Sequence, residues 1–107
     1  MVNFIPDADI KAIIQLNNVR RTPAADGYRP AHRVRQDYLA TGIHHYIGTH
    51  YLTPGSSCEG TITFLTPEFY PHCLQIGQVL DIQEGERIVG SAKILEIFNK
   101  ILEAQSE

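Results

Sequence analysis

Residues 81–90 read Asp81-Ile82-Gln83-Glu84-Gly85-Glu86-Arg87-Ile88-Val89-Gly90, and this stretch predicts a tight β-hairpin. Its two arms are Asp81–Gln83 and Arg87–Val89, and the turn between them contains Gly85. A glycine adopts a positive φ without the steric cost that a side chain brings, which suits a tight turn. We therefore expect two antiparallel strands joined at Gly85.

The segment after the hairpin allows two interpretations. Its apolar residues have a spacing that also suits an amphipathic helix: Ile94, Leu95, Phe98, Ile101 and Leu102. However, the β-branched pair Ile88–Val89 and the small residues Gly90–Ala92 favour a strand up to about Ile97. We expect that strand, with a helical turn in Asn99–Ala104, while residues 98–107 remain open between strand, helix and disorder.

Upstream of the hairpin, short strands alternate with turn signals. Asp9–Leu16 alternates apolar and polar residues, which is typical of a half-buried strand. Further strands are expected near 31–36, 40–47 and 58–65 and after Gly77, with a surface loop at 17–26, a turn at 53–56 and an irregular stretch at 67–71. Six short strands with no helix before the C-terminal segment predict an all-β fold, a barrel or sandwich.

Composition sets the class of the protein. The chain has 107 residues, of which 43% are hydrophobic and 20% charged, so residues 1–107 are expected to form one globular domain. The formal net charge is −3, which weighs against a general binder of polyanions but leaves room for a local basic patch.

Cysteine usage and hydropathy bear on the compartment. The two cysteines, Cys58 and Cys73, lack CxxC spacing, so reduced and buried thiols are expected rather than a disulfide scaffold. No apolar run approaches the ~18 residues of a membrane span, and the N-terminus lacks the basic region of a signal peptide. We expect a cytoplasmic protein that does not enter a membrane.

Six short motifs occur in order along the chain: Lys11-Ala12, Arg20-Arg21-Thr22-Pro23, Gly27-Tyr28-Arg29-Pro30, Pro54-Gly55, Leu65-Thr66-Pro67 and Glu84-Gly85-Glu86-Arg87-Ile88-Val89-Gly90. In this order and at nearly this spacing they resemble the C-terminal (third) β-barrel domain of elongation factor Tu. The resemblance implies a six-stranded antiparallel β-barrel of the translation-factor C-terminal-domain type. In that family, the barrel helps hold the T-stem of tRNA and contacts the GTPase domain.

The chain departs from the family at points that concern function. Gln83 stands where the family has an arginine, and Glu86 stands where it has a second glycine. A carboxylate facing a phosphate is repulsive, so both changes weaken contact with RNA at this hairpin. The stretch from Pro67 to Gly77 is also longer than in the family. No GxxxxGK[ST] loop is present, so we expect no GTP binding by this chain alone.

Catalytic and metal chemistry find little support in the sequence. His44 and His45 are neighbours in an expected strand and point to opposite faces, so at most one of them could join His50 in a metal site. Ser56-Ser57-Cys58 and His72-Cys73 offer nucleophiles and a base without an identifiable orienting group. We expect no enzymatic activity, no cofactor and no metal.

Two groups of residues are candidates for contact with a partner. Arginines gather in the first third of the chain, and Phe69 and Tyr70 lie in the 67–71 stretch. The arginines also fit a solvated outer face, and the aromatic residues also fit packing beneath the 67–71 loop. The candidate partner-binding residues are Tyr28, Arg29, Arg33, Arg35, Phe69, Tyr70, Glu84, Gly85 and Arg87.

These observations favour a non-catalytic module that engages a protein partner through a barrel similar to that of the translation factor. The alternative is an RNA- or tRNA-binding accessory of translation elongation. Its phosphate contacts would come from Arg29, Arg33, Arg35, Arg87 and Lys93.

Overall fold

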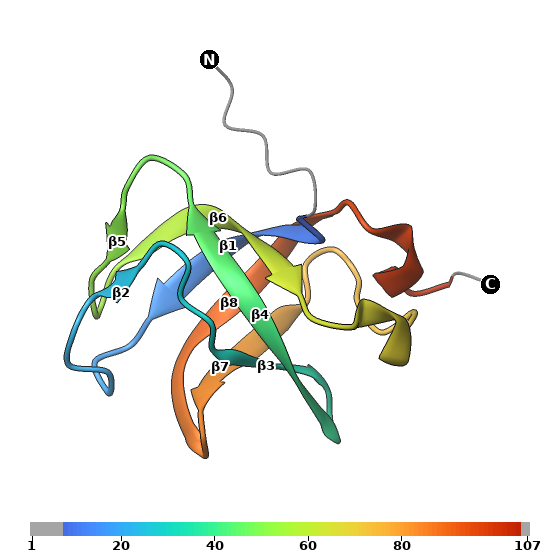
Figure 1. Cartoon of the computed structure of the whole chain (residues 1–107), viewed down its shortest axis with the longest axis horizontal. Coiled ribbons are helices and arrows are strands. Elements are labelled where there is room, and N and C mark those ends of the chain that lie inside the picture. The colour runs from blue at the N-terminus through green and yellow to red at the C-terminus, as the bar shows by residue number, and fades with distance from the viewer. Residues whose placement is uncertain (1–7, 106–107) are drawn as a thin grey trace.

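The chain folds into a closed six-stranded antiparallel β-barrel (Figure 1). The computed structural model describes residues 8–105. Its barrel strands are β1 (Ile10–Leu16), β3 (Ala31–Arg35), β4 (Tyr38–Tyr46), β6 (Ser57–Phe64), β7 (Val79–Glu84) and β8 (Arg87–Ile97). They are hydrogen-bonded in the order β1-β6-β4-β3-β7-β8, and β8 closes the barrel by pairing with β1. This architecture is the predicted fold class.

Strict alternation along the strands fills the barrel interior. In β1, the inward residues Ile10, Ala12, Ile14 and Leu16 are fully buried, whereas Ile13 is exposed on the outer face. Since side chains of a strand point alternately to its two faces, one face of each strand supplies the core. The period-2 pattern of the sequence therefore predicted this part of the core correctly.

The hairpin predicted around Gly85 is confirmed. β7 ends at Glu84, β8 begins at Arg87, and Gly85 between them has a φ of 62°. β8 continues as a strand to Ile97, as the β-branched and small residues predicted, and is followed by a 3₁₀ turn, η2 (Lys100–Leu102). The Asn99 side chain caps this turn by accepting a hydrogen bond from the Ile101 amide.

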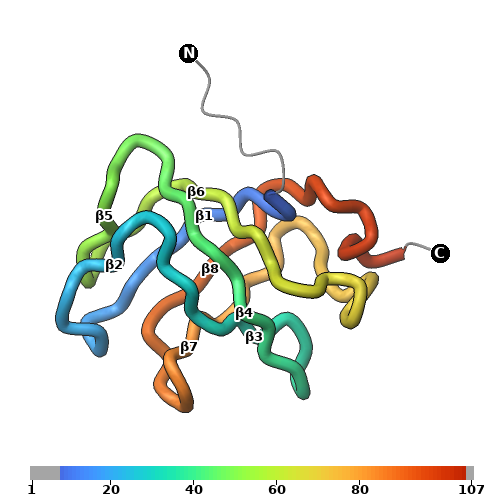
Figure 2. Tube along the Cα trace, in the orientation of Figure 1, coloured from blue at the N-terminus to red at the C-terminus, as the bar shows by residue number. Residues whose placement is uncertain are grey.

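The expectation of an irregular loop over residues 17–26 was wrong at one end. Ala24–Ala25 forms the short strand β2, which pairs with β5 (Tyr51–Leu52) in a separate two-stranded sheet (Figure 2). Ala24 and Leu52 are both buried. A two-residue strand has no period to detect, so its burial arises only when the distant partner strand is in place.

Asp9 ties the start of β1 to two other segments. Its buried carboxylate accepts hydrogen bonds from the Phe64 amide at 2.7 Å and from the Asn99 side chain at 2.9 Å. Its carbonyl accepts bonds from the amides of Phe98 and Asn99. These contacts fix the C-terminal segment against the barrel. Within residues 8–105, no helix has the length and hydropathy needed to span a membrane.

One of the six ladders that join neighbouring barrel strands is much shorter than the others. β3 and β7 pair only through Ala31 with Gln83 and His32 with Ile82, whereas every other neighbouring pair of barrel strands has at least four paired positions. The β3–β7 seam is therefore the shortest ladder that holds the barrel closed.

Candidate functional site

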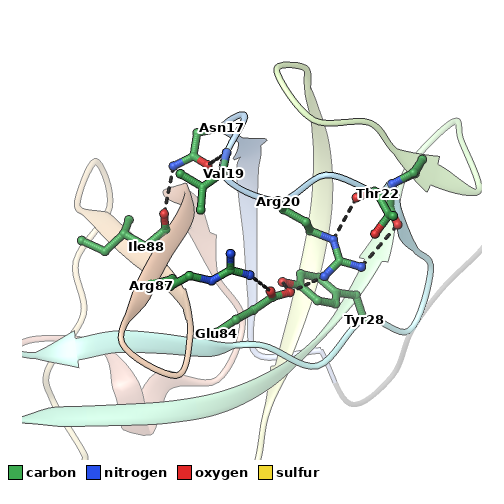
Figure 3. A network of polar contacts seen from close by, with 9 residues as sticks. Asn17, Val19, Arg20, Thr22, Tyr28, Glu84, Arg87 and Ile88 are labelled. Carbon is green, nitrogen blue, oxygen red and sulfur yellow. Dashed lines mark hydrogen bonds and ion pairs between the residues drawn. The ribbon is translucent and has the colours of Figure 1, made fainter.

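A polar cluster joins the two most distinctive sequence motifs. The Glu84 carboxylate, at the end of β7, accepts hydrogen bonds from the Tyr28 hydroxyl and from the Arg20 guanidinium (Figure 3). Arg87, across the hairpin turn, adds a longer contact of 3.4 Å to the same carboxylate. We call Arg20, Tyr28, Glu84 and Arg87 the Glu84 centre.

The loop after β1 positions Arg20 in the Glu84 centre. The Arg20 guanidinium donates to the carbonyls of Thr22 and Pro23, and it stacks 4.6 Å from the centroid of the Tyr28 ring. Asn17 anchors the same loop to the hairpin, because its amide donates to the Ile88 carbonyl at 3.0 Å (Figure 3). The loop and the hairpin therefore hold each other in place.

The charges of the Glu84 centre compensate one another. The hydrogen bond from Tyr28 and the positive charges of Arg20 and Arg87 lower the pKa of Glu84, against the opposing effect of partial burial. Burial and the neighbouring carboxylate raise the pKa of Tyr28, so its hydroxyl stays protonated and donates. Arg20 and Arg87 are thus already engaged by a carboxylate, which lowers their capacity to bind a phosphate.

The hairpin substitutions noted in the sequence have different environments. Gln83 is buried, accepts a hydrogen bond from Arg33 at 3.2 Å, and donates to the Gly85 carbonyl. A register shift between Ile82 and Gln83 places both side chains in the buried class. Glu86 is exposed at the turn. Gln83 is therefore a structural residue of the β3–β7 seam.

The candidate arginines lie on or beside β3. Arg33 is half-buried and is held by Gln83 and by the Gln36 carbonyl, at 2.7 Å. Arg35 is exposed and lies 3.8 Å from the Asp37 carboxylate. Arg29 is exposed, and within residues 8–105 it forms no hydrogen bond or ion pair. Of the three, Arg29 is the side chain whose donors remain available.

The two neighbouring aromatic residues have opposite environments. Tyr70 is fully buried, stacks with Tyr38 and Phe64, and donates its hydroxyl to the Leu65 carbonyl at 2.6 Å. Tyr70 is therefore a core residue, packed beneath the 67–71 loop, and its side chain is not exposed to a partner. Phe69, by contrast, is 67% exposed.

Phe69 belongs to a surface with several exposed apolar residues. The 3₁₀ turn η1 (Pro67–Phe69) lies beside η2 at one end of the barrel (Figure 1). The His72 amide donates to the Ile101 carbonyl at 2.7 Å, which joins the two segments. We call the exposed apolar residues of these segments the cap surface: Leu65, Phe69, Phe98 and Ile101.

Two buried histidines form a contact that the sequence analysis did not identify. His44 and His45 point to opposite faces, as predicted, and His44, which faces into the barrel, meets His32 of β3. The Nε2 atoms of His32 and His44 are 2.7 Å apart. The signal available in the sequence was that both histidines occupy inward positions of the strand alternation.

The cysteines and the possible metal ligands of the described residues form no further candidate site. Cys58 and Cys73 are free and half-buried, and burial raises the pKa of both thiols. In the described part of the chain, no three His, Cys, Asp or Glu side chains are grouped so that they could hold a metal ion. No model of a known protein family matches the sequence.

Proposed function

We propose that this chain is a stand-alone, non-catalytic binding module of the elongation factor Tu third-domain type, and that it engages a protein partner in the cytoplasm. The cap surface is the observation that carries this proposal. Phe69, Phe98 and Ile101 expose 67%, 47% and 40% of their surface, and backbone hydrogen bonds fix the segments that carry them. Ordered, exposed aromatic residues supply much of the binding energy of protein interfaces.

The Glu84 centre supports a protein partner over RNA. Both of its arginines contact the Glu84 carboxylate within the domain, and the family's hairpin arginine is replaced by a buried glutamine, Gln83. The motif residues that resemble the translation factor therefore stabilise the loop and hairpin. The partner that best suits this scaffold is a protein that recognises the barrel of the translation factor.

The experiment compares three forms of the protein as affinity baits. The cap variant is Phe69→Ser with Ile101→Ser, and the matched control is Ile47→Ser with Val79→Ser, two exposed apolar residues outside the cap surface. We expect a protein that binds the wild type and the control but not the cap variant. With the purified partner, calorimetry should show ~10-fold or greater weakening for the cap variant alone. Equal binding by all three forms would show that the cap surface is not the binding site for the partner.

RNA binding remains a second candidate because Arg29 is exposed and unengaged among the described residues, close in sequence to Arg33 and Arg35. A set of phosphate contacts makes affinity fall steeply with salt. The test is titration of a tRNA at several salt concentrations, with Arg29→Ala and Arg35→Ala compared with Lys100→Ala. Absence of binding at low salt would exclude this function.

A further inference from the structure

The buried histidine pair has one arrangement of protons that satisfies its contacts. His32 Nδ1 lies 3.1 Å from the Ala40 carbonyl, which can only accept, so Nδ1 carries the proton. In the neutral ring, His32 Nε2 then has the lone pair. His44 Nε2, at 2.7 Å, must therefore donate to it. Two protons therefore satisfy both contacts, which involve three of the four ring nitrogens. The fourth nitrogen, His44 Nδ1, carries a lone pair.

A third proton on this pair has to end on His44 Nδ1. The His32–His44 contact can carry only one proton between its two Nε2 atoms, and His32 Nδ1 is already protonated. His44 Nδ1 is buried and has no hydrogen-bond partner among residues 8–105. Protonation would therefore create both a buried positive charge and an unsatisfied N–H group, and each is costly in a barrel interior.

The surroundings of the pair offer no negative charge. His32 meets the edge of the Phe64 ring from β6, and His44 meets the rings of Tyr28 and Tyr46. The titratable groups around the pair are the phenols of Tyr28 and Tyr46 and the outward imidazole of His45; within residues 8–105, no carboxylate contacts either buried ring. Burial lowers the pKa of His32 to about 4, and burial with the neighbouring His32 and His45 lowers that of His44 well below its ordinary value.

One member of the pair, His32, lies at the shortest ladder of the barrel. His32 and Ala31 are the two residues of β3 that pair with β7, and His32 is opposite Ile82. All other adjacent barrel strands are joined by longer ladders. The extra proton ends on His44, in β4, so the link to the seam is access: separating β3 from β7 breaks the shortest ladder and opens the interior in which both rings lie.

We propose that the His32–His44 pair is an acid-sensitive lock on the β3–β7 seam: the closed barrel excludes protons from the pair, and acidification favours a state in which the seam is open. A histidine in the open chain takes up a proton below a pH of roughly 6.5. The closed state binds fewer protons there, so stability is complete above this pH and falls as the pH decreases towards the folded pKa values. With an open-chain pKa of roughly 6.5, two excluded protons correspond to roughly a 50-fold rise in the unfolding constant between pH 6 and pH 5.

The first experiment measures proton linkage. Urea unfolding of the wild type should show the unfolding constant rising by roughly 50-fold between pH 6 and pH 5. The exposed variant His50→Gln should keep this dependence, whereas His44→Leu should reduce it to about 10-fold or less. A wild-type dependence below 10-fold, or one that is lost in His50→Gln, would overturn the proposal.

Two measurements on the wild type keep the test decisive if His44→Leu does not fold. Imidazole ¹⁵N spectra should show a proton on His32 Nδ1 and on His44 Nε2, with no titration of either ring between pH 7 and pH 5. A ring that titrates near 6.5 in the folded protein would overturn the lock. Hydrogen exchange, corrected for intrinsic rates, should show the amides of Ala31 and Gln83, which point across the seam, losing protection at pH 5.5 before those of Ile14 and Ala92. Uniform loss would reject opening at the seam.

Discussion

The Tyr28 hydroxyl donates a hydrogen bond to the carboxylate of Glu84, 56 residues further along the chain. This contact connects the loop that leads into β3 with the end of β7. The two residues belong to two of the six short motifs of the sequence, at 27–30 and 84–90. Their contact gives both motifs a role in stability, because one supplies a hydrogen-bond donor and the other an ionised acceptor. Only the closed barrel brings these two residues together.

Removing the donor should weaken the barrel. We expect Tyr28→Phe to lower the free energy of unfolding by about 1–3 kcal/mol, because a partly buried charged acceptor loses one of its hydrogen bonds. Urea denaturation at pH 7 measures this change. Tyr51→Phe is the matched control, since Tyr51 is 60% exposed. An equal effect of the two substitutions would contradict the importance of the Tyr28–Glu84 bond.

The acid titration of Glu84 should depend on Tyr28. The hydrogen bond from Tyr28 is the largest cause of the lowered Glu84 pKa, followed among the lowering effects by the charge of Arg20. Since an unfolded glutamate has a pKa of about 4.3, the stabilisation is complete above that value and is lost as the pH falls through the lower folded pKa. NMR titration of the Glu84 carboxyl carbon should give a higher midpoint in Tyr28→Phe than in the wild type. An unchanged midpoint would show that the hydrogen bond from Tyr28 does not stabilise the ionised form of Glu84.

Gly90 should not tolerate a side chain. β8 passes so close to β1 here that a Cβ atom at Gly90 would collide with the Gln15 carbonyl, which is backbone and cannot turn away. Gly90→Ala should therefore cost about 1–3 kcal/mol or prevent folding. Ser91→Ala, at the next position of the strand, is the control. Thermal melts that place both variants at the wild-type temperature would refute the close approach.

Phe69 and Tyr70 should respond differently to the same truncation. Tyr70→Ala removes a fully buried ring and should cost about 3–5 kcal/mol. Phe69→Ala removes an exposed ring and should change stability by about 0.5 kcal/mol or less. Chemical denaturation of the two variants separates these outcomes. A large loss for Phe69→Ala would mean that the ring stabilises the cap itself.

Local sequence pattern predicted most of the secondary structure. The hairpin at Gly85 needs one residue with a positive φ, and β1 and β8 show their type through alternation and β-branched residues. The prediction failed at Ala24–Ala25, because a two-residue strand carries no periodic signal and exists only against Tyr51–Leu52. Strand period and turn chemistry are properties of neighbouring residues, which is why the sequence contains them.

The candidate site was less accessible to sequence reasoning. Tyr28, Glu84 and Arg87 were named as partner-binding residues, and that role stays a prediction; their mutual contact and the part of Arg20 in it required the closed barrel. The same holds for Phe69 and Tyr70, two adjacent aromatic residues with similar sequence surroundings and opposite exposure.

The sequence by itself determined the all-β class, the approximate positions of the barrel strands and the inward face of β1, since these depend on the alternation of apolar residues and on glycine in turns. Only the tertiary structure decided that Tyr28 meets Glu84, that His32 meets His44, and that the barrel closes on a two-residue seam. The physical reason is that these contacts join residues of different strands. Barrel closure and strand register set their distances, and no local pattern encodes either.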